Sequence, residues 1–262
     1  MTTLEELGLL KMDFLGLRNL TVLEDAARRV RRRVPDFQVE RIPLDDKKTF
    51  DMLAAGRTVG VFQLESAGIT SVCMGLRPRS IEDITAVIAL YRPGPMESIP
   101  RFLACSAHPE RITYQHPLLE PILAVTYGCI VYQEQVIEIF RQLAGFSLGQ
   151  ADMIRRAMSK KKEAVITAER AAFVHGDPAR SIPGAVANGV PEQTANAIYD
   201  EILAFASYAF NKAHAVSYAI VSYRTAYMKR NYPHEYMAAL LTSVLDNLSL
   251  IHISEPTRLR RI

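Results

Sequence analysis

Hydrophobic residues recur at every third or fourth position along most of the chain, which is the spacing of one face of an α-helix. The segments with this pattern are residues 19–34, 80–92, 135–146 and 147–158, the stretches that begin at Pro191 and after Asn211, and residues 234–247. They predict a mainly α-helical protein.

Several of these segments begin with residues that cap helices. Ser80 with Asp83 and Ser147 with Gln150 have the spacing of a capping box. The glycine- and proline-rich stretch 175–191 lacks a regular pattern and is typical of a surface loop that tolerates insertions.

Three shorter segments alternate hydrophobic and polar residues as β-strands do. They are residues 8–17, 57–66 and 127–135. In the first, Lys11 and Asp13 share one face of the predicted strand. Burying a carboxylate costs roughly several kcal/mol unless it is paired or binds a metal, so Asp13 points to a function. The expected fold class is α+β, mainly α with a few short β-strands.

Composition narrows the class of protein. The 262 residues are 49% hydrophobic and 23% charged, with a formal net charge of +3. Three widely spaced cysteines form no CxxC pair, which argues against a disulfide framework and a zinc site. No hydrophobic run approaches the roughly 20 residues that span a bilayer, and the acidic N-terminus is unlike a signal peptide. We therefore expect a cytoplasmic protein without a membrane partner.

Positive charge is concentrated in ADMIRRAMSKKK, residues 151–162, where five of the last eight residues are basic. Adjacent Arg155 and Arg156 point about 100° apart on a helix, so both cannot lie at the centre of one exposed face. Arginine also suits bidentate contact with phosphate. A solvated helix face is the alternative interpretation.

A second cluster surrounds the helix that begins after Asn211, in the stretch YAFNKAH. With Asn211 as N-cap, Lys212 and His214 fall in the first helical turn, near Tyr208. The helix dipole disfavours a cation there by about a few tenths of a kcal/mol, so the placement is better explained if a phosphate binds at this end. Alternatively, His214 is a core histidine.

Arg92 and the arginine-rich residues 28–33 indicate a function less strongly. Arg92 ends a helix and is followed by two prolines in YRPGP, which is a common way to stop a helix. Residues 28–33 contain five arginines, which either contact a nucleic-acid backbone or form a solvated face.

Taken in order, the strings LLKMDFLGLRNLTVL, IPLDDKKTFDML, GVFQLES, YRPGPM, YGCIVYQEQ, ADMIRRAMSKKK and YAFNKAHAVSYAIVSY resemble the alpha-subunit family of bacterial replicative DNA polymerase III (family C) over residues 1–247. The resemblance implies that residues 1–20 are the C-terminal end of a palm domain, including one palm strand. Residues 21–247 would then form the helical fingers domain.

The resemblance also implies roles for individual residues. Asp13 matches the third of three palm carboxylates that hold two Mg²⁺ ions for the addition of deoxynucleotides to a primer 3′ end. The residues implied near the incoming triphosphate are Lys11, Arg155, Arg156, Tyr208 and His214, and further contacts to phosphate or DNA are expected from Arg92, Lys212, Lys160 and Lys161.

The chain departs from the family pattern in ways that affect activity. It contains no Asp-x-Asp motif, which in the family supplies the other two metal carboxylates. We therefore expect Met1 to be an internal methionine of a longer protein and this part alone to be inactive. The expected ligands are primer–template DNA and deoxynucleoside triphosphates, while a sliding clamp and other replisome subunits would bind regions outside it. Residues 248–262 depart from the family and are expected to be a non-native tail.

Two other hypotheses remain open at this point. The chain could be a stand-alone helical module that binds nucleic acid without catalysis, or a helical scaffold that needs no metal. Crosslinking of a deoxynucleoside triphosphate near Lys212 and His214 would favour the polymerase hypothesis over the module. The scaffold would be favoured if Arg155→Ala and His214→Ala changed stability without affecting the binding of any ligand.

Overall fold

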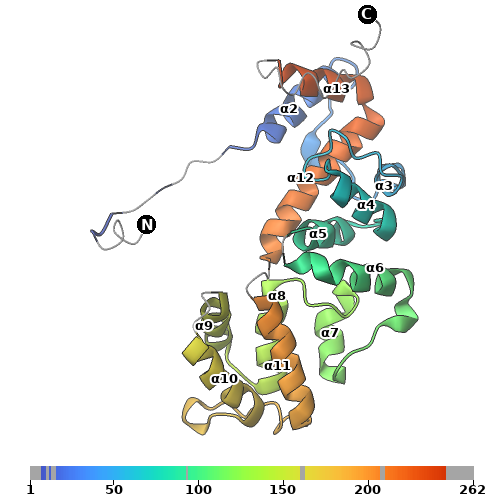
Figure 1. Cartoon of the computed structure of the whole chain (residues 1–262). Helices are drawn as coiled ribbons and strands as arrows, with labels where there is room; N and C mark the ends of the chain where they lie inside the picture. The colour runs from blue at the N-terminus through green and yellow to red at the C-terminus, as the bar shows by residue number, and fades with distance from the viewer. Residues whose placement is uncertain are drawn as a thin grey trace, which may run out of the picture.

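The computed structural model describes residues 7–9, 12, 16–92, 94–159, 163–206 and 210–245, and it is built almost entirely of helices (Figure 1). In chain order, with η for 3₁₀ helices, the elements are α2 (Arg18–Val30), η1 (Val39–Arg41), α3 (Lys47–Ala54), α4 (Ala67–Leu76), α5 (Ile81–Leu90), η2 (Pro95–Ser98), α6 (Ile99–Ala107), η3 (Pro109–Arg111), η4 (Pro117–Leu119), α7 (Glu120–Leu123), η5 (Ala124–Thr126), α8 (Gln133–Ala144), α9 (Leu148–Ser159), α10 (Glu163–His175), η6 (Pro178–Arg180), α11 (Glu192–Ala206), α12 (Lys212–Asn231) and α13 (Pro233–Thr242).

The helices form two halves, each with its own hydrophobic core (Figure 1). The upper half contains α2 to α6, α12 and α13, and the lower half contains α7 to α11. No helix within the described ranges has the length and apolar character that crossing a membrane requires. The prediction of a mainly helical protein is confirmed.

The upper core is organised around α12, which packs along α5, α3, α2 and α13. Its buried Tyr223 shows how distant segments are joined. The Tyr223 hydroxyl donates to the carbonyl of Pro43 at 2.9 Å and accepts from the backbone N–H of Asp46 at 2.9 Å. The start of α3 is thereby fixed to the middle of α12.

The lower core is built from helices that are neighbours in the sequence. Phe140 on α8 lies edge-on to Phe173 on α10, with ring centroids 5.0 Å apart, and Tyr199 on α11 completes the aromatic cluster. Edge-to-face pairs of this kind add about 0.5–1.5 kcal/mol beyond the burial of their area.

Helix caps follow the sequence closely. The predicted capping boxes are both present, with Ser80 Oγ accepting from the N–H of Asp83 at 3.2 Å and Ser147 Oγ accepting from that of Gln150 at 3.3 Å. Asn211 caps α12 as predicted, since its Oδ1 accepts from the N–H of His214 at 2.9 Å. These caps depend only on residues within three positions of each other.

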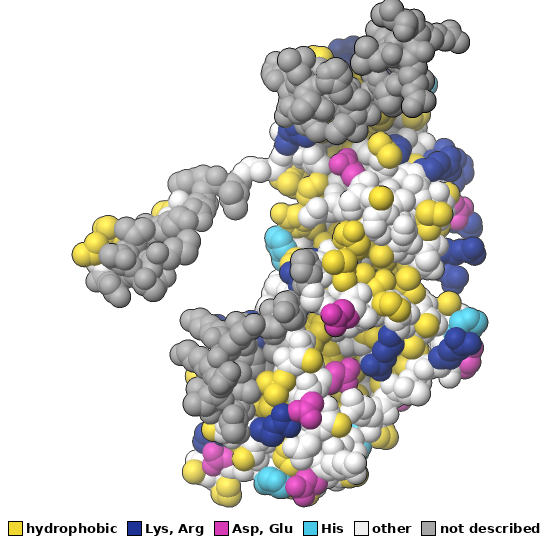
Figure 2. Space-filling view, in the orientation of Figure 1, with side chains coloured by type: hydrophobic (Ala, Val, Ile, Leu, Met, Phe, Trp, Pro, Cys, Tyr) yellow, Lys and Arg dark blue, Asp and Glu magenta, His cyan; other side chains and the backbone are white. Residues whose placement is uncertain are grey.

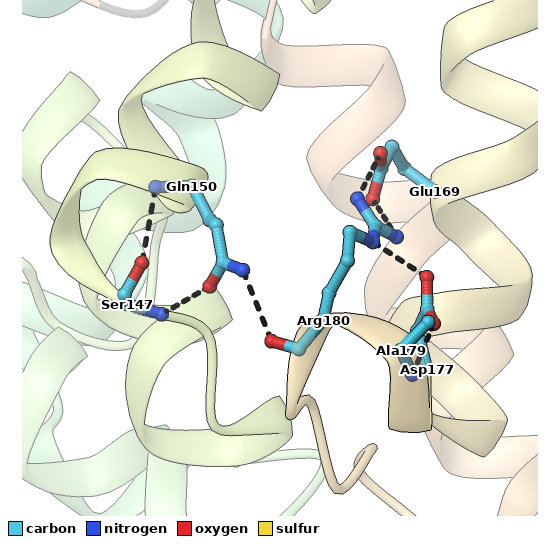
Figure 3. Close-up of polar contacts among 6 residues, drawn as sticks. All are labelled: Ser147, Gln150, Glu169, Asp177, Ala179 and Arg180. Carbon is cyan, nitrogen blue, oxygen red and sulfur yellow. Dashed lines mark hydrogen bonds and ion pairs between the residues drawn. The ribbon is translucent and has the colours of Figure 1, made fainter.

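The loop 175–191 is tied into the lower half by Arg180 (Figure 3). The guanidinium pairs with Glu169 on α10 at 2.7 Å and with Asp177 at 2.5 Å, and the pKa of Arg180 is raised by its hydrogen bonds to these carboxylates. The Gln150 side chain donates to the Arg180 carbonyl at 3.3 Å. This loop therefore contacts the first turn of α9, and its tolerance of insertions stays a prediction.

The prediction of short β-strands is wrong, because the described residues contain only isolated β-bridges. In residues 57–66 the backbone turns at Gly60 and at Gln63, both with positive φ. The backbone carbonyls of this segment accept hydrogen bonds from side chains of the last two helices. Lys229 donates to two of these carbonyls, and Tyr236 donates to the Gly60 carbonyl at 2.6 Å.

The segment 127–135 also forms no strand, although its alternation has a physical basis. Cys129 and Val131 face the upper core and Ile130 faces the lower one. The buried Gln135 side chain accepts from the N–H groups of Val131 and Tyr132 at 2.8 and 2.9 Å. Only one parallel bridge, Tyr132 to Phe210, extends from this segment within the described residues.

The third expected strand, the palm strand at residues 8–17, cannot be assigned to a sheet. Half of it, including Lys11 and Asp13, lies outside the described residues. The described residues around it contain no strand with which it could pair.

Candidate functional site

The first turn of α12 binds a carboxylate of the protein itself, the side chain of Glu134. Both oxygens of the Glu134 carboxylate accept from the N–H of Lys212, at 3.1 and 3.0 Å, and the Asn211 side chain donates to Glu134 Oε1 at 3.0 Å. An anion at this end is favoured by the free N–H groups and the helix dipole. The position predicted for a phosphate thus holds a carboxylate, and the ammonium group of Lys212 lies 5.4 Å from the centre of the Tyr132 ring.

Arg155 on α9, in the lower half, contacts Gln133, the residue next to Glu134. Its Nη1 donates to Gln133 Oε1 at 2.9 Å and its Nε to Asp152 Oδ1 at 3.0 Å. The Arg155 side chain is 17% exposed, and its hydrogen bond holds the pKa of Asp152 below the usual range. Arg155 therefore does not belong to a solvated helix face.

Arg156 differs from its neighbour, as the 100° between adjacent helical side chains requires. Its side chain is 69% exposed, and its guanidinium pairs with Asp152 Oδ2 at 2.7 Å. The two arginines thus share one carboxylate, and Arg156 remains accessible from solvent.

Arg92 and His214 line one cavity of about 760 Å³ between the start of α12, the end of α5 and residues 62–66. The Arg92 guanidinium lies over the Phe210 ring, 4.1 Å from its centre, and burial lowers the pKa of Arg92. On the face shown in Figure 2, hydrophobic side chains gather where the two halves meet.

The dipeptide Gln133–Glu134, at the start of α8, connects the predicted residues. Gln133 receives Arg155 through its side chain and donates its N–H to the carbonyl of Phe210 at 2.9 Å, while Glu134 caps the helix that carries His214. The structure therefore brings together the start of α12 and Arg155. The remaining predicted site residues, Asp13, Lys11, Tyr208, Lys160 and Lys161, lie outside the described residues.

Three of the five arginines in residues 28–33, at the end of α2 and just after it, form ion pairs within the protein. Arg28 pairs with Asp25, Arg31 with Glu24, and Arg33 with Glu235 on α13. This favours the interpretation of a solvated, ion-paired face over a surface dedicated to nucleic acid.

Sequence reasoning missed several residues of this site. No function was expected for the segments that contain Phe62, Gln63, Gln133 and Glu134, because their mixture of polar and apolar residues is also typical of packing at the edge of a core. The signal that distinguishes Glu134 is long-range, since its partners Asn211 and Lys212 lie far along the chain.

The described part of the chain contains no group of side chains that could bind a metal ion. Among these residues, no three His, Cys, Asp or Glu side chains are grouped so that they could hold a metal ion. The metal ligand implied by the resemblance, Asp13, lies outside them.

The observed features define a helical domain that presents cationic and aromatic side chains at the junction of two cores. The sequence model of the bacterial DNA polymerase III alpha subunit finger domain matches residues 19–180. The chain is 48% identical to DNA polymerase III subunit alpha of Halalkalibacterium halodurans over 263 residues, which covers 100% of this chain and 22% of the relative. It is 50% identical to that of Thermus aquaticus over 248 residues, with coverage of 92% and 20%.

The chain belongs to the bacterial DNA polymerase III alpha subunit family. The resemblance drawn from its motifs is thereby confirmed. The chain spans about a fifth of the length of the curated relatives that it matches.

Proposed function

We propose that this chain supplies the fingers of a DNA-directed DNA polymerase, which hold the incoming deoxynucleoside triphosphate against primer–template DNA. The observation that carries this proposal is the junction at Gln133–Glu134, which holds the cation of Arg155 on one side and the helix start with His214 on the other. Family membership supplies the class of reaction.

The proposed chemistry of the site is electrostatic. Charge that develops on the phosphoryl oxygens during nucleotidyl transfer would be neutralised by Arg155, Arg156 and Lys212. Mg²⁺, when bound by Asp13 together with carboxylates outside this chain, would activate the primer hydroxyl and stabilise the leaving pyrophosphate. Lys11, Tyr208 and His214 would contact the same nucleotide, and Arg92, Lys160 and Lys161 would contact further phosphates.

The proposed division of the chain follows from these roles. Residues 1–20 would belong to the palm, residues 21–247 to the fingers, and residues 248–262 to a non-native tail. Because the sequence contains no Asp-x-Asp motif, we expect the isolated chain to bind nucleotide or DNA without extending a primer. A sliding clamp and other replisome subunits would bind elsewhere in the polymerase, and the cytoplasm is the compartment that this role implies.

Photocrosslinking with 8-azido-dATP tests the proposal on the 262-residue chain. We expect adducts in the peptides that contain Arg155 and His214. Arg155→Ala should lower the yield about 10- to 100-fold, because a hydrogen bond to a charged group contributes about 1.5–3 kcal/mol. Arg141→Ala is the matched control, since Arg141 is an arginine on α8 that pairs only with nearby Glu138 among the described residues.

Two results would contradict the polymerase proposal. Adducts confined to peptides outside the junction would place the triphosphate elsewhere. Tight binding of DNA with no triphosphate adduct at all would favour a nucleic-acid-binding module without catalysis.

A further inference from the structure

The cavity beside α12 has aromatic walls, and of these rings the triphosphate role uses only that of His214. A row of four rings runs along the cavity, in the order Phe210, His214, Tyr218 and Phe62. The centroids of successive rings are 5.4, 4.4 and 5.3 Å apart. The spacing of four residues along the chain places the rings of His214 and Tyr218 on one face of α12. The volume of about 760 Å³ suits a ligand of nucleotide size.

Gln63 stands in this wall in a strained conformation. Its φ is 63°, in the left-handed region that non-glycine residues rarely adopt. Neighbouring contacts enforce the conformation, since the N–H of Phe62 donates to Thr225 Oγ1 at 3.1 Å and that of Leu64 to the Val61 carbonyl at 3.0 Å. Such strain often marks a functional position. The Gln63 side chain is exposed and, among the described residues, makes no hydrogen bond.

The charge of the cavity favours an anionic ligand. Arg18 at the start of α2 and Arg92 after α5 line it, with Glu65 as the acidic residue of the lining. Arg155 and Lys212 do not line it and lie instead against Gln133 and Tyr132. Two arginines from separate elements of the lining give the cavity positive charge with which it can contact the phosphates of a nucleic-acid strand.

We propose that this cavity binds one unpaired base of a single DNA strand. The base stacks on Phe62 and Tyr218, the amide of Gln63 meets its hydrogen-bonding edge, and Arg18 and Arg92 contact the flanking phosphates. Stacking on aromatic side chains is how proteins hold unpaired strands, and glutamine pairs best with the N6 and N7 atoms of adenine. The inference rests on the proposed function for the choice of DNA as ligand.

Photocrosslinking of a single-stranded oligonucleotide that contains one 5-iodo-2′-deoxyuridine tests the position of the base in the full chain. We expect the adduct on Phe62 or Tyr218, located by mass spectrometry of the peptides. Phe62→Leu and Tyr218→Leu should each weaken oligonucleotide binding by about 5- to 150-fold. Tyr114→Leu, in a partly buried tyrosine against the lower core, should leave the binding unchanged.

Gln63→Gly removes the side chain proposed to recognise the base without disturbing the fold, because glycine adopts the left-handed conformation without strain. The unmodified chain should prefer adenine at the tested position by about 5-fold over the other bases. Gln63→Gly should abolish this preference while the melting temperature stays constant or rises. Equal affinity of the unmodified chain for all four bases would overturn the role of Gln63.

The outcomes distinguish this inference from the proposed function. Adducts away from Phe62 and Tyr218, in a chain that still crosslinks 8-azido-dATP at Arg155, would overturn the strand site alone. Failure to bind both the oligonucleotide and the triphosphate would overturn both proposals.

Discussion

The two halves of the molecule are assembled from the sequence in opposite ways. The lower half is contiguous, with α7 to α11 following one another and packing on Phe140, Phe173 and Tyr199. The upper half joins the two ends of the described chain, because α12 and α13 pack on α2, α3 and α5. Side chains on α12 reach back to segments more than 160 residues earlier, as Tyr223 does to Pro43 and Thr225 to Phe62.

The two halves therefore contribute to the candidate site in different ways. The lower half is a local unit that supports α9 and its Arg155. The upper half shapes the cavity through long-range contacts, so its geometry depends on α12. The candidate site lies where the two halves meet, at Gln133 and Glu134.

The largest expected effects come from truncating one buried aromatic residue in each core. Tyr223→Ala and Phe140→Ala should each destabilise the protein by about 3–5 kcal/mol. Hydrogen exchange should show Tyr223→Ala exposing α2, α3 and α12, and Phe140→Ala exposing α8 to α10. Tyr223→Phe, which removes only the hydroxyl, should cost about 1–3 kcal/mol. Uniform loss of protection in both variants would show that the halves form one cooperative unit.

Gln135→Leu should have the next largest effect, because it leaves the buried N–H groups of Val131 and Tyr132 without their acceptor. The expected loss of stability is about 2–4 kcal/mol in chemical denaturation, since each unpaired group costs about 1–3 kcal/mol. Gln142→Leu is the control on the exposed side of the same helix, and its denaturation midpoint should stay near that of the unmodified chain.

Arg180→Ala tests the tie between the loop 175–191 and α10, because it removes the guanidinium that pairs with Glu169 and keeps the backbone carbonyl that accepts from Gln150 (Figure 3). We expect a loss of about 1–2 kcal/mol, reduced from the value for buried charged hydrogen bonds because Arg180 is partly exposed. Protection should fall in α10, fall less in α9, whose Gln150 keeps its backbone acceptor, and persist in α12. An equal loss of protection in α12 would mean that the loop also stabilises the upper half.

Glu134→Ala removes the carboxylate that caps α12. The expected cost is about 0.5–2 kcal/mol, the range for the loss of a helix cap. Exchange should increase at Lys212 and its neighbours while the middle of α12 stays protected. Glu138→Ala, on an exposed face of α8, is the control. Unchanged exchange at Lys212 would contradict the contact.

The smallest effect concerns pH. Asp152 has a lowered pKa because Arg155 donates to it, so the folded state favours its ionised form. That contribution is present above the ordinary aspartate pKa of about 3.9 and is lost as the pH falls through the lowered value. The ¹⁵N NMR signal of the Arg155 Nε–H should therefore shift below about pH 4. Asp152→Asn should abolish this transition; its persistence in that variant would assign it to another group.

Local rules predicted local structure well. The caps at Ser80, Ser147 and Asn211 each depend on a partner three residues away, so the sequence alone reveals them. The strand predictions failed because alternation reports which side of the backbone is buried, and not what the backbone hydrogen-bonds to. Residues 129–131 alternate between two cores, and the amide of Gln135 replaces a neighbouring strand.

The functional roles of the candidate site residues stay predictions, and the sequence pointed only to residues that stand in motifs. Motifs pointed to Arg155 and His214, but the contacts of Glu134 with Lys212 and of Lys229 with the Val59 carbonyl join residues that are far apart in the sequence. The left-handed backbone conformation of Gln63 is likewise imposed by the surrounding fold. The sequence GVFQLES contains no turn signal that would predict this conformation.

Primer extension by a chimera measures whether this chain can serve as the fingers of a polymerase. Residues 1–247 of this chain would replace the matching part of a full-length relative. We predict that the chimera extends primers with Mg²⁺, that Asp13→Ala lowers the rate by about 100-fold or more, and that Asp25→Ala on α2 does not. A folded chimera that binds primer–template but cannot extend it, or one that is indifferent to Asp13→Ala, would contradict the account.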